Sequence, residues 1–273
     1  MDSLKANKDE WGKRYNKIIP VIEKQIIFLE EIITSFMENN DVNRISDFQL
    51  LCFGYLIIAK NNLKATYLLV MNNLYHQAHF IRRNMFEMAL NLFYMEHNID
   101  YARDVLVERY FDHGAVRSYD ALLTMLRHPE GFENIRNEVK DQTVMTGYQN
   151  YLDKYELKKR PQYWSGKNPR QMIDRISDNK LQSLFLEDYE LLNKIDNWQL
   201  HPSAYYVKIA IDDEEFNNKC YGAKAAILSS MYQLTHRILS KFFYANEAYA
   251  IQFRDRLEDL LNMWKPDEVV QDK

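Results

Sequence analysis

Apolar residues recur at steps of three and four along much of this chain, and this spacing constrains the fold more than any other feature. Such spacing places apolar side chains on one face of an α-helix. The clearest run is Ile18, Ile19, Ile22, Ile26, Leu29, Ile32, Ile33 and Phe36. No stretch of convincing length alternates apolar and polar residues as a half-buried strand would. Only seven glycines and six prolines occur in 273 residues, so tight turns are scarce and we expect an all-α fold.

Boundary signals place the first four helices. The first spans about residues 10–39, with a kink or a late start at Pro20. Ser46 and Gln49 have the spacing of a capping box, so a second helix follows to about residue 71. A third covers residues 75–97. We expect Asp100 to cap a fourth helix over residues 101–127, which His128-Pro129 ends.

The second half of the chain is also helical in its pattern. Residues 130–159 are charged, which suggests an exposed helix or a hairpin broken near Gly147. Residues 158–167 form the clearest loop, and Asn168-Pro169 opens a short helix through Ile176. Further helices follow at 181–198, 214–245 and 249–264, and 265–273 is a polar tail. We therefore expect a single helical bundle of seven or eight helices, forming one domain.

Charge and cysteine content exclude several classes of protein. The net charge of -4 argues against a protein that coats DNA, although it allows a local basic patch. Cys52 and Cys220 are far apart and form no CxxC motif, which indicates a reducing compartment. The longest apolar run, residues 50–59, is about half of the roughly 20 residues that a membrane crossing needs. With no secretory leader visible, we expect a soluble, cytoplasmic protein without membrane spans.

Motif spacing gives no support for a cofactor or a metal. The chain has no Glu-x-x-His pair, no HExxH motif and no glycine-rich phosphate loop. Asp212, Asp213, Glu214 and Glu215 could bind a cation, but carboxylates at a helix N-terminus also complement the helix dipole. We favour the second interpretation and expect no metal and no cofactor.

A polar stripe on the third helix is the first candidate site. At about 100° per residue, one third of the helix circumference carries His79, Arg83, His76, Tyr94, Glu87 and Asn91. Arg83 and Glu87 are four residues apart and can pair. Because Arg precedes Glu, the order is the less favourable one for helix stability. The stripe is therefore a binding site or a solvated face, and the spacing allows both.

Three further groups have residue types that suit chemistry. His201 precedes a proline at a helix end, where an imidazole can act as an acid or base or cap the helix carbonyls. Arg109 and His113, with Asp112 nearby, could bind a phosphate or form a salt bridge. Trp164 lies in a loop before a helix N-terminus, where it could help to seat an anion or plug the end of the bundle. We favour the plug.

These residues resemble a bacterial family that is known only as a domain of unknown function. The run from Tyr75 to Glu87 is similar to its Arg-x-x-x-Glu helix, Trp164-Ser165-Gly166-Lys167 to its loop, and Tyr189 with His201-Pro202-Ser203 to its last signature. The resemblance implies a family-like core at 46–206, between an N-terminal helix at 1–45 and C-terminal helices at 207–264. It also implies that Arg83, Glu87, Trp164, His201 and Tyr189 share one site.

A more distant resemblance is to the HEPN superfamily, helical bundles that include ribonucleases of toxin and phage-defence systems. Those enzymes have four to six residues between an Arg and a His, whereas Arg109 and His113 have three. We expect a phosphate-bearing ligand such as RNA or a nucleotide, bound and cleaved by His201, Arg83 and Glu87. His79, Tyr189, Trp164, Arg109 and His113 would assist binding. The alternative is a non-catalytic homodimer, packed through the long C-terminal helix, in which Arg83, Glu87 and His201 form a structural clasp.

Overall fold

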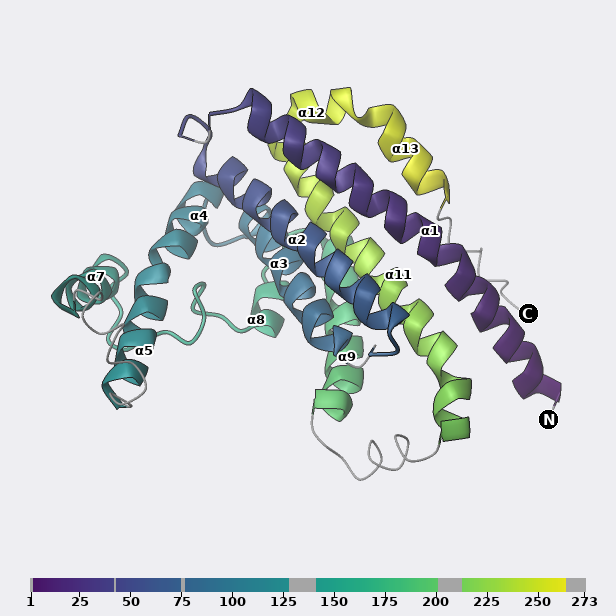
Figure 1. The fold of residues 1–273 in the computed structure, drawn as a ribbon. Helices are drawn as coiled ribbons and strands as arrows, with labels where there is room; N and C mark the ends of the chain where they lie inside the picture. Colours follow the sequence, from purple (N-terminus) through teal and green to yellow (C-terminus); the bar gives the residue numbers. More distant parts are fainter. Residues whose placement is uncertain (1, 42, 75–76, 128–140, 201–212, 264–273) are drawn as a thin grey trace. The chain divides into compact units, whose positions relative to one another are not determined.

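The computed structural model describes residues 2–41, 43–74, 77–127, 141–200 and 213–263 (Figure 1). These residues are helical apart from short connections, and within them the one β-type pairing is an isolated bridge between Asn98 and Ile176. The all-α prediction is therefore confirmed. The internal contacts divide the chain into a first unit, residues 1–93 and 183–273, and a second unit, residues 94–182. The prediction of a single domain stays a prediction.

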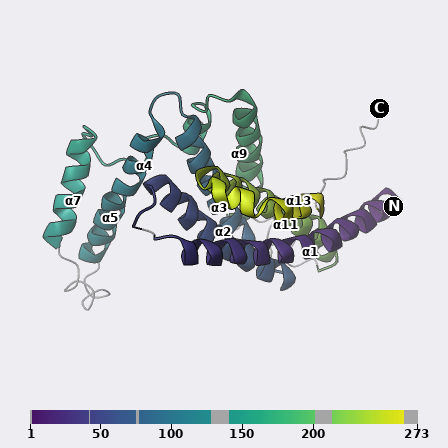
Figure 2. The ribbon, with the colours of Figure 1, turned by 90° about the horizontal axis from the view of Figure 1, so that it is seen from above.

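Three long helices form the centre of the first unit. They are α1 (Asp2–Asn39), α2 (Asp47–Met71) and α11 (Asp213–Ala245), which pack along one another in both ribbon views (Figures 1 and 2). Where they meet, Phe36 of α1 lies with its ring centroid 4.3 Å from that of Phe53 and 5.3 Å from that of Phe242. All three rings are buried, so this aromatic cluster forms part of the apolar core that stabilises the unit.

The remaining helices of the first unit attach to these three. Helix α3 (Ala78–His97) contacts α9 (Asn179–Leu200) through Phe185, whose ring lies 6.0 Å from Phe86 and 5.2 Å from Phe93. An ion pair between Asp188 and Arg237 joins α9 to α11. Helices α12 (Glu247–Gln252) and α13 (Arg254–Met263) follow α11, and α13 packs on α1.

The predicted capping box at the start of α2 is confirmed. The Gln49 amide donates to Ser46 Oγ at 3.3 Å, and the Ser46 amide donates to Gln49 Oε1 at 3.0 Å. At its other end α2 closes with a Schellman motif, in which Asn73 has a φ of 62° and the Leu74 amide donates to the Leu69 carbonyl. This reversal, with Asn73 in the left-handed region, explains why the next helix begins at Ala78 rather than at residue 75.

The second unit contains α4 (Arg103–Asp112), α5 (Gly114–Arg127), α7 (Asp141–Lys154) and α8 (Pro169–Ile173). Helices α5 and α7 lie side by side (Figure 2). The prediction of one helix over 101–127 is wrong, because the helix breaks at His113, whose carbonyl accepts from the Val116 amide, and Gly114 follows. Glycine in this position lowers the cost of the break.

Of the two alternatives for this region, α7 fits the exposed helix and not a hairpin broken near Gly147. The helix continues through it, and a Cβ at this position would lie 3.9 Å from Cβ of Ala115 on α5. The two small residues allow the helices to approach closely.

The predicted cap at Asp100 is wrong. Helix α4 has no side-chain cap, and Asn98 Oδ1 instead accepts from the backbone amides of Asp100 and Tyr101.

Several other boundaries differ from the prediction. Helix α1 begins at Asp2 and continues through Pro20, and α8 ends at Ile173 rather than Ile176. The last predicted helix is divided at Phe253 into α12 and α13. His128-Pro129, His201-Pro202 and the polar tail lie outside the described residues.

Candidate functional site

The second unit carries a pocket formed by the chain that follows α7. Helix α7 ends in a second Schellman motif, in which Glu156 has a φ of 51° and the Leu157 amide donates to the Leu152 carbonyl at 2.8 Å. Glutamate is unusual in this left-handed conformation, which costs a residue with a Cβ about 1 kcal/mol or more. The sharp reversal directs residues 157–168 into a loop, as the sequence predicted.

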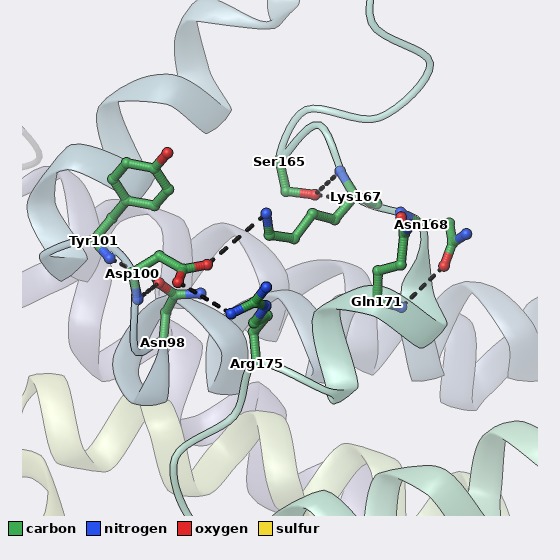
Figure 3. Close-up of polar contacts among 8 residues, drawn as sticks. All are labelled: Asn98, Asp100, Tyr101, Ser165, Lys167, Asn168, Gln171 and Arg175. Atoms are coloured by element: carbon green, nitrogen blue, oxygen red, sulfur yellow. Dashed lines mark hydrogen bonds and ion pairs between the residues drawn. The ribbon is translucent and has the colours of Figure 1, made fainter.

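The buried side chain of Trp164 anchors the C-terminal part of this loop. Its ring is buried and lies edge-on to Tyr94 at 6.0 Å and to Tyr110 at 5.4 Å. The next residue, Ser165, accepts from the Lys167 amide at 3.1 Å and donates to the Lys167 carbonyl at 2.9 Å, as Figure 3 shows. These hydrogen bonds hold the turn in which Gly166 has a φ of 72°.

A charged network joins the loop to the turn before α4 (Figure 3). Asp100 lies between two cations, with carboxylate oxygens 3.8 Å from Lys167 Nζ and 3.5 Å from Arg175 Nη1. Backbone hydrogen bonds support the contact, because the Ile99 amide donates to the Arg175 carbonyl and the Ser177 amide donates to the His97 carbonyl. The network therefore fixes the loop within the unit.

The N-terminus of α8, which the sequence suggested as an anion site, is capped by side chains of the protein. Asn168 Oδ1 accepts from the Gln171 amide at 2.9 Å, and the Asn168 amide donates to Gln171 Oε1 at 3.0 Å (Figure 3). This capping box satisfies the first turn of a helix of only five residues. An anion would have to bind elsewhere on the loop.

The pocket has a volume of about 620 Å³ and a basic lining. We call it the basic pocket; its lining residues are Glu156, Leu157, Lys158, Lys159, Arg160, Pro161, Gln162, Tyr163, Gly166, Asn168 and Gln171. Lys158, Lys159 and Arg160 are consecutive and exposed, and Glu156 is the one acidic residue of this lining. Arg160 also forms an ion pair with Asp120 at 2.8 Å. Such a lining attracts anions.

Three polar side chains lie directly behind the pocket wall. A Cβ on Gly166 would stand 3.5 Å from Nη2 of Arg109, so the bare glycine brings that guanidinium close to the wall. His113 and Tyr151 are buried with their rings 5.8 Å apart. Within the described part of the chain, Arg109 Nε and His113 Nε2 make no hydrogen bond of good geometry.

The electrostatics of this layer keep the imidazole neutral. Burial lowers the pKa of His113 below 6.5, and the neighbouring charges of Arg117 and Arg109 lower it further, against a backbone hydrogen bond to Pro161 and the charge of Asp120. Burial raises the pKa of the Tyr151 hydroxyl, and the nearby Arg109 opposes that rise. At neutral pH the layer therefore has one fixed positive charge, on Arg109, next to two neutral groups.

Arg109 is held in place from its other side. Its guanidinium carbon lies 5.1 Å from the centroid of the Tyr155 ring, and the Tyr155 hydroxyl donates to Asp112 at 2.8 Å. Lys154 bridges Asp112 at 2.6 Å and Glu108 at 2.7 Å. Lys154 therefore pairs with both carboxylates, while the guanidinium of Arg109 stacks on the Tyr155 ring.

The other predicted site residues lie in the first unit. Arg83 Nε is 3.4 Å from Glu87 Oε1, with side chains 39% and 46% exposed, so the predicted pair forms on a half-exposed face. His79 is buried, and Tyr189 on α9 lies with its ring 6.3 Å from Phe86 of α3. His201 lies outside the described residues, so its convergence with Arg83 and Glu87 stays a prediction.

The structure thus joins Arg109, His113 and Trp164 in the second unit, and Arg83 and Glu87 in the first. Neither Tyr151 nor the place of Lys158, Lys159 and Arg160 in the pocket lining was predicted from the sequence. The three consecutive cations in the clearest loop were a usable signal for a basic patch. Tyr151 carried no comparable signal, because a tyrosine on a helix fills a core equally well.

Two classes of site are not found among the described residues. They contain no group of three or more His, Cys, Asp and Glu side chains that could hold a metal ion. The side chains of the acidic run 212–215 lie outside them. None of the described helices combines the length and apolar character needed to cross a membrane.

Comparison with known proteins identifies a sequence family. Residues 49–219 match a sequence family described as a family of unknown function, DUF5677. No curated protein and no solved structure matches the chain.

Proposed function

Because the chain belongs to the DUF5677 family, whose description names no activity, we propose from the site itself that the protein binds a phosphate-bearing ligand in the basic pocket. The observation that carries this proposal is the lining of the pocket. Three consecutive cations, Lys158 to Arg160, line a volume of about 620 Å³. The guanidinium of Arg109 lies behind Gly166 in the pocket wall. Arginine and lysine are the side chains that hold phosphate oxygens.

The charges around the pocket support an anion rather than a cation as ligand. Glu156 is the one acid among three cations in the lining, and two acids nearby are paired: Asp120 with Arg160, and Asp112 with Lys154 and Tyr155. RNA and nucleotides, the ligands that the sequence analysis favours, present such phosphates. The likeness to the HEPN superfamily remains part of this proposal.

The test is a charge change on the pocket rim. Replacing Lys158 and Lys159 together by Ala removes two cations that contact phosphate, so we expect weaker binding of a fluorescently labelled single-stranded RNA. The slope of log K against log salt should fall by about 1.4, since each contact to a single strand contributes about 0.7. Fluorescence anisotropy at several salt concentrations measures both quantities.

Lys180 supplies the matched control, because it is an exposed lysine of the same unit that does not line the pocket. Lys180→Ala should leave affinity and slope unchanged. Equal effects of Lys180→Ala and the double variant would mean that RNA binds through overall charge alone, and the pocket proposal would be wrong. Inorganic pyrophosphate, titrated by calorimetry, provides a second probe that carries no base or sugar.

Cleavage of a phosphate-bearing ligand, at Arg83, Glu87 and His201 rather than in the basic pocket, is a separate part of the proposal. Arg83 would hold a phosphate, Glu87 would orient Arg83 or His201, and His201 would move protons. The Arg83–Glu87 pair at 3.4 Å is compatible with these roles. If Arg83→Ala and His201→Ala both leave RNA cleavage and cellular toxicity at the wild-type level, these residues have no catalytic role.

The alternative is a non-catalytic homodimer that packs through α11 and serves interaction or regulation, with Arg83, Glu87 and His201 as a clasp. One observation favours it: Tyr221 and Tyr244 on α11 are 41% and 59% exposed, and large exposed rings are typical of contact surfaces. Light scattering at micromolar concentration would contradict it by giving the monomer mass of 32.8 kDa.

A further inference from the structure

One aromatic pair in the second unit is arranged differently from its neighbours. The rings of Tyr119 on α5 and Tyr148 on α7 are stacked in parallel, with centroids 4.0 Å apart and an interplanar angle of 4°. By contrast, the ring of Trp164 meets Tyr110 at 81°, and Tyr151 meets His113 at 72°. Both stacked tyrosines are only partly buried. Aromatic rings stack on further rings through their π-faces, and the part of this pair that is not buried can take part in such stacking.

Charged contacts place this pair beside the basic pocket. Asp120, the residue after Tyr119, forms the ion pair with Arg160, which lines the pocket. The same two charges act on Tyr148: burial and the neighbouring Tyr119 raise its pKa, Arg160 lowers it and Asp120 raises it. Arg160 therefore lines the pocket and also lies within electrostatic reach of Tyr148.

We infer that the ligand of the basic pocket carries a nucleobase, which stacks on the Tyr119–Tyr148 pair while its phosphate contacts Lys158 and Lys159. This inference rests on the proposed function and names the ligand class. A nucleotide has an aromatic ring and an anion at opposite ends, which matches an aromatic pair and a cationic rim joined by Arg160. A sugar phosphate or inorganic polyphosphate would leave the aromatic pair unused.

Stacking also predicts little discrimination among bases. Every base has a π-face, and stacking on aromatic side chains tolerates changes of sequence. No hydrogen-bonding group has to read a base edge for this mode of binding. Adenine and uracil nucleotides should therefore bind with affinities within about tenfold of each other.

The experiment compares two ligands that differ only in the base. We use 2-aminopurine ribonucleoside 5′-monophosphate, whose fluorescence is quenched on stacking, and ribose 5-phosphate, followed by calorimetry. The wild-type protein should quench the fluorophore and bind the nucleotide at least about tenfold more tightly than the sugar phosphate. Tyr148→Ala should lose most of this preference and leave ribose 5-phosphate affinity within twofold.

Two control variants separate stacking from other effects. Tyr148→Phe keeps the ring and should retain the preference for the nucleotide. Tyr101→Ala removes an exposed tyrosine of the same unit outside the pair and should change neither affinity. Binding of ribose 5-phosphate also reports whether Tyr148→Ala retains a folded pocket.

The outcomes distinguish the two proposals. If both ligands bind the wild-type protein equally and no quenching occurs, the nucleobase inference is overturned while phosphate binding stands. If neither ligand binds, the proposed function itself fails. If Tyr148→Ala also loses ribose 5-phosphate, the wild-type quenching and the behaviour of Tyr148→Phe decide the question.

Discussion

Glu156 illustrates how one residue shapes the candidate site. It occupies the left-handed position that ends α7, and its carboxylate is the one acidic group in the lining of the basic pocket. Both properties are unfavourable, the first for backbone conformation and the second for anion binding. The sequence gives no sign of this conformation, because glycine or asparagine is the residue that usually marks it.

We therefore predict that Glu156→Gly raises the free energy of unfolding by about 0.5–1 kcal/mol, since it relieves the left-handed strain. It should also tighten pyrophosphate binding. Glu156→Ala removes the same charge but keeps the strain, so it should tighten binding without the gain in stability. Chemical denaturation and calorimetry measure the two effects. Equal stability of both variants would contradict the conformational explanation.

His113 makes stability depend on pH. Its unfolded pKa is near 6.5, and burial lowers the pKa in the folded protein. The unfolded state therefore binds protons more readily, so the contribution of His113 is full above pH 6.5 and decreases as the pH falls from 6.5 toward the folded pKa. His236 is shifted in the same direction in the first unit.

An NMR titration of the histidine ring protons tests this directly, with the His113 signal assigned from the spectrum of His113→Asn. We expect His113 to titrate below pH 6.5. A midpoint at or above 6.5 would mean that the imidazole is accessible to solvent or faces an unrecognised acid, and the neutral layer behind the pocket would be wrong.

At the scale of elements, Gln49 connects two helix ends of the first unit. While it completes the capping box of α2, its Nε2 donates to the Ala245 carbonyl at 3.0 Å and to Asn246 Oδ1 at 3.1 Å. One side chain therefore satisfies groups at the start of α2 and the end of α11. The capping box could be predicted from local spacing, whereas the contact with residues 245 and 246 depends on tertiary packing.

Gln49→Glu should destabilise the protein by about 2 kcal/mol. The carboxylate keeps the acceptor of the capping box but loses both donated hydrogen bonds, and it places negative charge at the C-terminus of α11, where the helix dipole disfavours it. Gln233→Glu, an exposed substitution on α11, should have little effect. Thermal unfolding followed by circular dichroism compares them, and equal melting temperatures would contradict the assigned role.

Some helix boundaries could be predicted from the sequence and others could not. The caps at Ser46 and Asn168 and the helical periodicity could be recognised because they are local. The breaks at His113 and Phe253 and the continuity through Gly147 could not, since they depend on which helices pack together. Asp100 had the residue type of a cap, yet its carboxylate pairs with Lys167 and Arg175, which are distant in sequence.

At the scale of the whole molecule, two groups of charged residues are candidates for the ligand site. Arg83 and Glu87 lie in the first unit and were recognised from helix spacing, whereas the basic pocket lies in the second unit. A net charge of -4 conceals the local basic lining, so overall composition could not identify it. The pocket requires the reversal after α7 and the anchored Trp164 loop, which only tertiary structure brings together.

The most direct test is a titration of ¹⁵N-labelled protein with inorganic pyrophosphate, followed by amide chemical shifts. We predict that the largest shifts occur at residues 158–160 and at Gly166, and that Lys158→Ala with Lys159→Ala abolishes them. Shifts confined to residues 79–87 of α3, or no shifts at millimolar ligand, would contradict phosphate binding in the basic pocket.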